Sequence, residues 1–223
     1  MNLLKMALVH AKEWLYTVPE VYLGIGRPLH GAQLSGPQVD FLINTLSSVR
    51  DVPGDVIECG VFRGGGLLTF CLAMTRLKIK KQVYAVDTFC GMPKPSCEDL
   101  PDSGTSVFEG AFRYNSPKLI AGRLRIAGER KRVTLVQGLF EDALPQLRHE
   151  QTFSLAFIDC DFYNSARFCL DWLYPRMNRG GYLCIHDYHS RDAPGITRAF
   201  DEFVSGKPEV GESIWNIGYI VKK

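Results

Sequence analysis

The run Val56-Ile57-Glu58-Cys59-Gly60-Val61-Phe62-Arg63-Gly64-Gly65-Gly66 decides the fold of this chain. A short apolar segment ends in a carboxylate, turns through glycines and enters a pattern of apolar residues with helical spacing. A second apolar segment, residues 83–86, follows and ends at Asp87. Strand, glycine turn, helix, strand and acid outline a nucleotide-binding βαβ unit, in which glycines admit a ligand close to the backbone and the acid can hold a ribose diol.

The spacing of the glycines narrows the choice of nucleotide. From Glu58 to Gly66 it reads E-x-G-x-x-x-G-G-G, whereas the dinucleotide fingerprint is G-x-G-x-x-G. The observed spacing fits a dinucleotide pyrophosphate poorly. It therefore points away from NAD and towards another adenosine-bearing ligand.

Length and composition indicate one domain of ordinary size. The chain has 223 residues, of which 46% are hydrophobic and 22% are charged, and these values are typical of a soluble globular protein with a substantial core. The net charge of +2 is too small to argue for a nucleic-acid partner or an anionic membrane surface.

The cysteines and the N-terminal residues indicate the compartment. The seven cysteines include no C-x-x-C pair, so buried free thiols in a reducing compartment explain them most simply. Lys5, His10 and Lys12 interrupt the N-terminal apolar pattern, which argues against a signal peptide. No run reaches the roughly 18 apolar residues of a membrane-spanning helix. We therefore expect a cytoplasmic protein.

The chain before the quoted run predicts a helical leader. Residues 1–50 contain apolar residues at helical spacing near their start and a second such pattern at residues 38–49. This leader can act as a lid over a ligand site, or it can simply pack as a pair of helices. We expect it to belong to the same domain as residues 51–223.

The chain after the quoted run alternates strands and helices. Expected strands cover residues 133–136, 153–158 and 182–185, and expected helices cover residues 108–127, 165–173 and 195–204. Pro117 interrupts the first of these helices or starts one piece of it. Arg179-Gly180-Gly181 predicts a turn, and the stretch 90–106, rich in Pro, Gly and Ser, predicts a functional loop. The alternation predicts an α/β fold, with a doubly wound, mostly parallel sheet covered by helices on both faces.

Acidic residues recur where the predicted strands end. Ligands in such sheets bind at the carboxyl ends of the strands. One acid at a strand end is often only the N-cap of the next helix, but their repetition favours a ligand site. These ends carry Glu58, Asp87, Glu141 with Asp142, Asp159 with Asp161, and His186 with Asp187.

Asp159, Asp161, His186 and Asp187 lie at the ends of two strands that we expect to be neighbours. Three or four of these side chains can converge on one divalent ion. Carboxylates suit magnesium, whereas an imidazole shifts the preference towards manganese, iron, cobalt or zinc. Such an ion acidifies a substrate hydroxyl, and Asp161 or His189 can then accept the proton. The alternative is that these acids cap helices or pair with nearby arginines.

The order of these segments resembles that of the macrocin-type sugar O-methyltransferases. The resemblance runs from about residue 50 to residue 204. It rests on Gly54 to Gly65, Asp87-Thr88-Phe89-Cys90-Gly91-Met92-Pro93, Gly138-Leu139-Phe140-Glu141-Asp142-Ala143-Leu144-Pro145, Asp159-Cys160-Asp161-Phe162-Tyr163, Leu173-Tyr174-Pro175, Gly180-Gly181-Tyr182, His186-Asp187-Tyr188 and Pro194-Gly195.

The resemblance implies a class I methyltransferase fold that binds S-adenosylmethionine, with a divalent metal such as Mg²⁺ at the acceptor. It assigns Asp159 and Asp187 to the metal and Asp161 to the base. The family usually has two adjacent acids where this chain has His186-Asp187, so the third metal ligand departs from the pattern. The implied cofactor residues are Glu58, Gly60, Phe62, Arg63, Gly64, Gly65, Asp87, Thr88, Gly138, Phe140, Glu141 and Asp159.

The sequence therefore predicts metal-assisted methyl transfer from S-adenosylmethionine to a hydroxyl of a sugar or other polyol-bearing natural product. The expected partner is a small hydroxylated acceptor, and apolar residues of the leader hint at self-association. One alternative is a cofactor-binding protein without activity, in which His186 marks a degraded metal site. A weaker alternative is an NAD-dependent oxidoreductase, although the Y-x-x-x-K pattern of that chemistry is missing because Arg167 follows Tyr163 at that offset.

Overall fold

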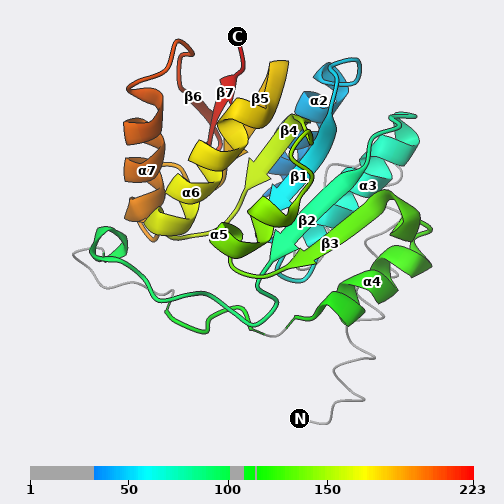
Figure 1. Cartoon of the computed structure of the whole chain (residues 1–223), viewed down its shortest axis with the longest axis horizontal. Coiled ribbons are helices and arrows are strands. Elements are labelled where there is room, and N and C mark those ends of the chain that lie inside the picture. The colour runs from blue at the N-terminus through cyan, green and yellow to red at the C-terminus, as the bar shows by residue number, and fades with distance from the viewer. Residues whose placement is uncertain (1–32, 101–107, 114) are drawn as a thin grey trace.

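The fold is a seven-stranded sheet in the order β3-β2-β1-β4-β5-β7-β6 (Figure 1). The computed structural model describes residues 33–100, 108–113 and 115–223. Strands β1 to β5 run parallel, and β7 lies antiparallel between β5 and β6. The strands are β1 (Asp55–Cys59), β2 (Val83–Asp87), β3 (Val133–Gln137), β4 (Phe153–Ile158), β5 (Met177–Ile185), β6 (Glu212–Ile214) and β7 (Ile217–Val221).

Helices cover both faces of this sheet, as the alternation of elements predicted. In Figure 1, α5, α6 and α7 lie in front of the sheet, and α2 and α3 lie behind it. The α-helices are α2 (Gly36–Ser48), α3 (Gly65–Arg76), α4 (Pro117–Ile126), α5 (Phe140–Ala143), α6 (Tyr163–Leu173) and α7 (Pro194–Val204).

Successive residues of the central strands enter two separate cores. Val56 and Leu155 pack with residues of α2, α3 and α4, whereas Ile57 and Ala156 pack with residues of α5, α6 and α7. Side chains alternate between the two faces of a strand, so a strand covered on both sides is apolar throughout. This is why β4, in which every residue is buried, matches its predicted range of 153–158.

The predicted turn at residues 179–181 is wrong, because these residues continue β5. The strand begins at Met177 and pairs with β4 through a register irregularity between Phe153 and Leu155. Gly180 has φ +82°, and a Cβ on Gly181 would lie 2.9 Å from the carbonyl oxygen of Ser154. The glycines therefore mark a local irregularity and a close backbone approach inside the strand rather than its boundary.

Of the predicted helix at residues 108–127, only the piece that starts at Pro117 forms within the described residues. Residues 108–113 form turns, and α4 begins at Pro117. Ser116 is the N-cap and accepts a hydrogen bond from the backbone N–H of Leu119. Proline at the first helical position, directly after a capping serine, sets the start of the helix.

The part of the leader that the structure describes ends in the predicted helix. This helix, α2, starts at Gly36 behind a capping box of Ser35 and Gln38, and its apolar face packs onto α3 in the first core. The predicted first helix of the leader lies outside the described residues.

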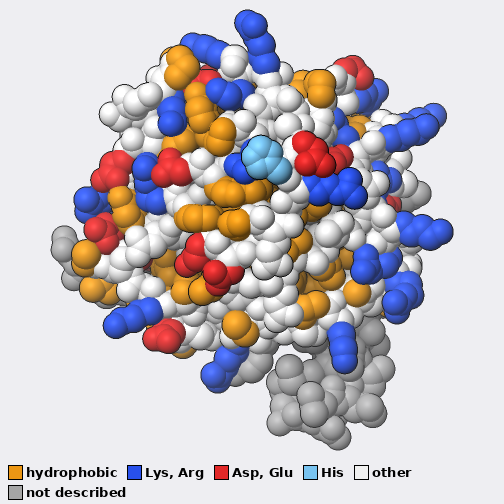
Figure 2. Space-filling model, in the orientation of Figure 1, with side chains coloured by type: hydrophobic (Ala, Val, Ile, Leu, Met, Phe, Trp, Pro, Cys, Tyr) orange, Lys and Arg blue, Asp and Glu red, His pale blue; other side chains and the backbone are white. Residues whose placement is uncertain are grey.

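No helix within the described ranges is both long and apolar enough to cross a membrane. On the face shown in Figure 2, Lys and Arg side chains are interspersed with Asp and Glu.

Candidate active site

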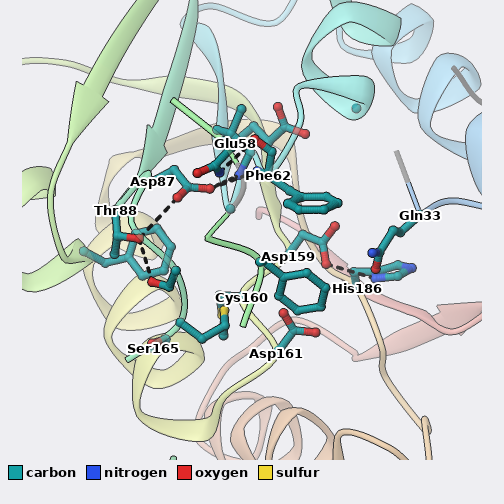
Figure 3. A pocket seen from close by; sticks show the side chains of 18 of the residues that line it. Gln33, Glu58, Phe62, Asp87, Thr88, Asp159, Cys160, Asp161, Ser165 and His186 are labelled. Atoms are coloured by element: carbon teal, nitrogen blue, oxygen red, sulfur yellow. Dashed lines mark hydrogen bonds and ion pairs between the residues drawn. The ribbon is translucent and has the colours of Figure 1, made fainter. Parts of the chain in front are cut away.

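One cavity opens at the carboxyl ends of β1, β2, β4 and β5, where the sheet order reverses between β1 and β4 (Figure 3). Because the order of the strands reverses at this point, the loops that follow the two adjacent strands diverge. Open α/β sheets bind their ligands in the crevice between such loops. The open space measures about 960 Å³, part of it continuous with solvent. Acids at the ends of these strands face it, among them Glu58, Asp87, Asp159, Asp161 and Asp187.

The glycine turn after β1 is held by the carboxylate of Asp87. Its Oδ2 accepts hydrogen bonds from the backbone N–H groups of Val61 (2.7 Å) and Phe62 (2.9 Å). Its Oδ1 accepts from the N–H of Phe89 at 2.7 Å. Gly60, with φ +93°, passes so close to β4 that a Cβ would lie 1.8 Å from the carbonyl oxygen of Asp159. The main chain therefore sets the shape of this wall, and only glycine fits at position 60.

Glu58 is a buried carboxyl group without a complete set of partners. Its Oε2 has no hydrogen-bond partner among the described residues, and the side chain is 3% exposed. Burial raises its pKa well above the usual range, and the nearby carboxylates of Asp159 and Asp87 raise it further. A Cβ on Gly66 would lie 2.3 Å from Oε1, so the glycine leaves room for this carboxyl group. An unpartnered buried acid that lines a cavity is typical of a ligand contact.

The predicted loop after β2 forms a second rim of the cavity. The N–H of Met92 donates to the carbonyl of Ala111 (2.8 Å), and the N–H of Gly110 donates to the carbonyl of Met92 (2.9 Å). Phe112 packs edge-on against Phe62 with ring centroids 5.1 Å apart. These contacts tie the two described ends of the loop together beside the glycine turn.

Across the cavity, Asp159 and Asp187 meet at His186. Nδ1 of the imidazole lies 3.0 Å from Oδ1 of Asp159 and 3.3 Å from Oδ2 of Asp187. One ligand atom from each of these side chains lies within 4.8 Å of the others, an arrangement that could hold a metal ion. Asp187 and the neighbouring Asp161 both have left-handed backbone conformations, with φ of 60° and 58°. Strained backbone of this kind concentrates at functional sites.

The pKa values of this wall depend on the contacts between its side chains. Burial raises the pKa of Asp161 to about 8, with the charges of Asp159 and Asp187 adding to the effect and His186 opposing it. Burial lowers the pKa of His186, but the two carboxylates outweigh burial and raise it above its usual range. The amide nitrogen of Gln38 lies 3.0 Å from the other imidazole nitrogen, Nε2. That contact acts against the two carboxylates, because a second proton on the ring would place two N–H donors face to face. The donor clash favours the neutral ring, with its one proton on the nitrogen beside the carboxylates.

The structure brings most of the predicted site residues to one cavity. The predicted residues that line it are Glu58, Gly60, Phe62, Asp87, Thr88, Phe140, Asp159, Asp161, His186 and Asp187.

Other predicted site residues lie outside the lining. Gly64 and Gly65 start α3 behind the turn, and the guanidinium of Arg63 packs over the Phe62 ring. Gly138 and the exposed Glu141 flank Phe140 without lining the cavity themselves. His189 lies in a separate surface recess beside Thr197 and Arg198. The ring of His189 lies against that of Tyr188 in a tilted arrangement, with centroids 3.9 Å apart, so the structure does not place it with the other candidate bases.

Several lining residues were not predicted from the sequence. Leu34 from the leader, Met92 and Phe112 from the loop, and Asn115 before α4 all face the cavity. Oδ1 of Asn115 is buried with no partner among the described residues, while its Nδ2 donates to the carbonyl of Phe62 at 2.9 Å. Leu34 and Met92 lie in the leader and in the loop at residues 90–106, which the sequence predicted as functional segments without naming these residues. The sequence contains no signal for Phe112 and a weak one for Asn115, which directly precedes the Ser-Pro start of a helix.

A model of the macrocin O-methyltransferase (TylF) family matches residues 24–220. The chain belongs to this family. The match spans the glycine turn, the loop after β2 and all strands whose ends line the cavity. It thereby confirms the resemblance drawn from the sequence.

Two curated relatives that are O-methyltransferases align with about three fifths of the chain. Mycinamicin III 3''-O-methyltransferase of Micromonospora griseorubida is 30% identical over 151 residues, which are 64% of this chain and 58% of that protein. The 8-demethyl-8-(2,3-dimethoxy-alpha-L-rhamnosyl)-tetracenomycin-C 4'-O-methyltransferase of Streptomyces olivaceus is 33% identical over 144 residues, 61% of this chain and 54% of that protein. The alignments thus span little more than half the length of these relatives.

Solved methyltransferase structures share the fold of this chain. The O-methyltransferase NovP superposes with a TM-score of 0.74 at 22% identity, covering 86% of this chain and 82% of the other. CalS11, a calicheamicin methyltransferase, superposes with a TM-score of 0.69 at 18% identity, covering 95% and 91%. These likenesses confirm the predicted class I methyltransferase fold.

Proposed function

We propose that this protein is an S-adenosylmethionine-dependent O-methyltransferase that methylates a hydroxyl group of a sugar or another polyol-bearing small molecule. The observation that carries the proposal is the cavity with two unlike acidic walls. One wall combines the backbone-bound Asp87 with the unpartnered Glu58, and the other gathers Asp159, Asp161 and Asp187. The names of the family and of the relatives support the same reaction class.

The first wall fits the cofactor. The buried, unpartnered Oε2 of Glu58 suits a cationic amine such as the ammonium group of S-adenosylmethionine. Oδ2 of Asp87 accepts from two backbone N–H groups and Oδ1 from one, which leaves Oδ1 a lone pair for a ribose hydroxyl. When bound, the cofactor supplies a methyl group on an electrophilic sulfonium. The residues of this wall bind and orient it, and Phe140, the first residue of α5, also lines the cavity.

The second wall supplies the base. We assign Asp161 to accept the proton of the acceptor hydroxyl, because its pKa of about 8 makes it a stronger base than an ordinary carboxylate. A general base works best when its pKa lies near the operating pH. Asp159 and Asp187 would orient the hydroxyl beside it, and the three acids together favour a polar, hydroxylated acceptor over an apolar one.

The sequence also predicted that a divalent ion assists this reaction. Asp159 and Asp187 offer suitable carboxylate oxygens, and the third candidate ligand is Nδ1 of His186. Whether Nδ1 has a free lone pair decides whether this donor set fits an ion. The same question bears on the alternative of a binding protein without activity, in which His186 marks a degraded metal site. The NAD-dependent alternative has no support in the family or in the relatives named above.

A transfer assay tests the proposal. The purified protein is incubated with S-adenosylmethionine labelled in its methyl group and with a panel of glycosides and polyols, and methylated products are detected by mass spectrometry. We expect label on an acceptor oxygen and stoichiometric S-adenosylhomocysteine. Tight cofactor binding without transfer to any panel member would favour the binding protein, and absence of cofactor binding would contradict both.

A further inference from the structure

The side chain of Gln38 is fixed by two partners that allow only one orientation of its amide. Its Oε1 accepts hydrogen bonds from the N–H and the hydroxyl of Ser35, at 2.7 and 3.0 Å. Its Nε2 donates to the carbonyl oxygen of Trp215 at 2.8 Å. A backbone N–H can only donate and a carbonyl oxygen can only accept. Exchanging the two amide atoms would therefore place donor against donor and acceptor against acceptor.

This orientation determines which imidazole nitrogen of His186 carries the proton. The second hydrogen on Nε2 of Gln38 faces Nε2 of His186, 3.0 Å away. Nε2 of the imidazole must then accept, and a neutral imidazole that accepts at one nitrogen donates from the other. Both side chains are buried, with 7% and 8% of their surface exposed, so water is a poor substitute for either partner.

We infer that Gln38 is a positioning residue that places the proton of His186 on Nδ1, so that the imidazole N–H, rather than a divalent ion, links Asp159 and Asp187. Nδ1 lies 3.0 Å from Asp159 and 3.3 Å from Asp187, within reach of one shared hydrogen. The inference adds detail to the proposed function. It rests on that function only in taking Asp159 and Asp187 as residues of the acceptor site.

Because Nδ1 of His186 carries a proton, Asp159, His186 and Asp187 together do not form a suitable set of metal ligands. A metal-bound histidine offers a lone pair and donates its other N–H to a hydrogen-bond acceptor. In His186 both nitrogens have the opposite roles. The candidate ligand atom Nδ1 donates a proton, and the other nitrogen, Nε2, accepts one from the amide of Gln38. The distances alone do not separate the two cases, because ligands of one ion also lie this close together. The direction of the Gln38 amide separates them.

Nitrogen NMR on the full chain, near neutral pH and free of added metal, reads the position of this proton. For the protein labelled with ¹⁵N at histidine, we expect a protonated Nδ1 and an unprotonated Nε2 for His186, assigned with the His186→Asn variant. In Gln38→Glu the carboxylate accepts from the ring, and Nε2 becomes protonated. The matched control Gln146→Glu, at an exposed glutamine bonded within its own turn, leaves the signals unchanged. A protonated Nε2 in the parent protein would overturn the inference.

Manganese titration gives a second readout that needs no turnover. We expect no saturable Mn²⁺ binding that depends on Asp159 in the parent protein. His186→Asp restores two adjacent acids and is expected to raise Mn²⁺ affinity at least roughly tenfold, and adding Asp159→Asn removes the gain. Stoichiometric Mn²⁺ binding by the parent, lost in Asp159→Asn, would overturn the inference. S-adenosylhomocysteine binding, measured on the same samples, separates this failure from failure of the proposed function.

Discussion

The two walls of the cavity are built by different means. On the β1–β2 wall, Asp87 is held by backbone N–H groups of the glycine turn and of Phe89, so residues adjacent to the strand ends fix the geometry. On the β4–β5 wall, His186 is held by side chains, including Gln38 from 148 positions earlier in the chain. The first wall depends on main-chain shape and the second on long-range side-chain partners. Substitutions should therefore affect the two walls in different ways.

The largest effect is expected where the walls meet. Gly60→Ala places a Cβ 1.8 Å from the carbonyl oxygen of Asp159 at a φ of +93°. Strand β1 and the end of β4 must then separate, which we expect to lower the free energy of unfolding by about 4 kcal/mol or more. Chemical denaturation measures this change. Gly110→Ala is the matched control, since Gly110 also has positive φ but a Cβ there would meet no described residue within 4 Å, and it should lose only about 1 kcal/mol.

A loss of catalysis without a loss of binding is expected on the β4–β5 wall. Asp161→Asn removes the proposed base and should lower turnover roughly 10² to 10³-fold, while S-adenosylhomocysteine binding stays within about twofold because the first wall is intact. Parallel kinetics and calorimetry check this separation. Asp171→Asn, an exposed acid on α6 paired with Arg167, is the control. Equal turnover in Asp161→Asn and the parent would remove Asp161 from the proposal.

The parent enzyme should also lose activity at low pH. Because the pKa of Asp161 is raised to about 8, the fraction of the base form falls as the pH drops below that value. We therefore expect the turnover rate under saturating cofactor to rise with pH through the neutral range, and the rise to be absent in the residual activity of Asp161→Asn. A pH-independent rate in the parent would contradict the assignment of this base.

The first wall should respond to a change of a single hydrogen-bonding atom. In Asp87→Asn, the amide nitrogen must face either the N–H groups of Val61 and Phe62 or the N–H of Phe89. Either choice sets donor against donor, at a cost of about 1 to 3 kcal/mol. We expect lower thermal stability and weaker S-adenosylhomocysteine binding together. Unchanged binding would mean that the glycine turn keeps its shape without this carboxylate.

The smallest effect is expected for an acid that belongs to neither wall. Glu209 accepts hydrogen bonds from Tyr174 (2.8 Å) and from the backbone N–H of Lys223 (3.1 Å). Burial raises its pKa, but these hydrogen bonds and that from Lys222 outweigh burial and lower it to about 2. A lowered pKa stabilises the fold above the ordinary value of 4.5, and this stability disappears as the pH falls from there towards 2.

Glu209→Gln should therefore cost about 1 to 2 kcal/mol at neutral pH and little in strong acid. Cofactor binding should not change, because Glu209 does not line the cavity. Thermal unfolding across the acid range, with calorimetry at neutral pH, measures both quantities. A constant stability difference between the variant and the parent at every pH would contradict the lowered pKa of Glu209.

The difference between the β1–β2 wall and the β4–β5 wall also explains which features could be predicted from the sequence. The acids at the ends of β1, β2, β4 and β5 were identified because they directly follow apolar segments, and strand ends in a parallel sheet meet at one edge. Phe153–Ile158 was placed correctly because a fully buried strand is apolar at nearly every position, here at all except Ser154. The glycines of β5 were misread as a turn because close backbone approach and chain reversal both select glycine.

The contact of His186 with Gln38, and that of Gln38 with Trp215, could not be predicted from sequence spacing. Gln38 belongs to the leader and Trp215 to the turn between β6 and β7, where Trp215 and Asn216 both have positive φ. Their meeting depends on how α2 and the last hairpin pack against the sheet, which no local pattern encodes. The metal prediction relied on residue type, on the position of these residues at two strand ends and on the family resemblance, and the direction of the Gln38 amide group now bears on it.

Calorimetric titration with S-adenosylhomocysteine of the parent, Glu58→Gln and Asp161→Asn tests the division of the cavity most directly. We predict tight binding to the parent, at least roughly tenfold weaker binding to Glu58→Gln because a neutral amide replaces the buried acid, and parent-like binding to Asp161→Asn. NAD should give no signal with any of the three proteins. No binding to the parent, or equal binding to the parent and Glu58→Gln, would contradict the assignment of the β1–β2 wall to the cofactor.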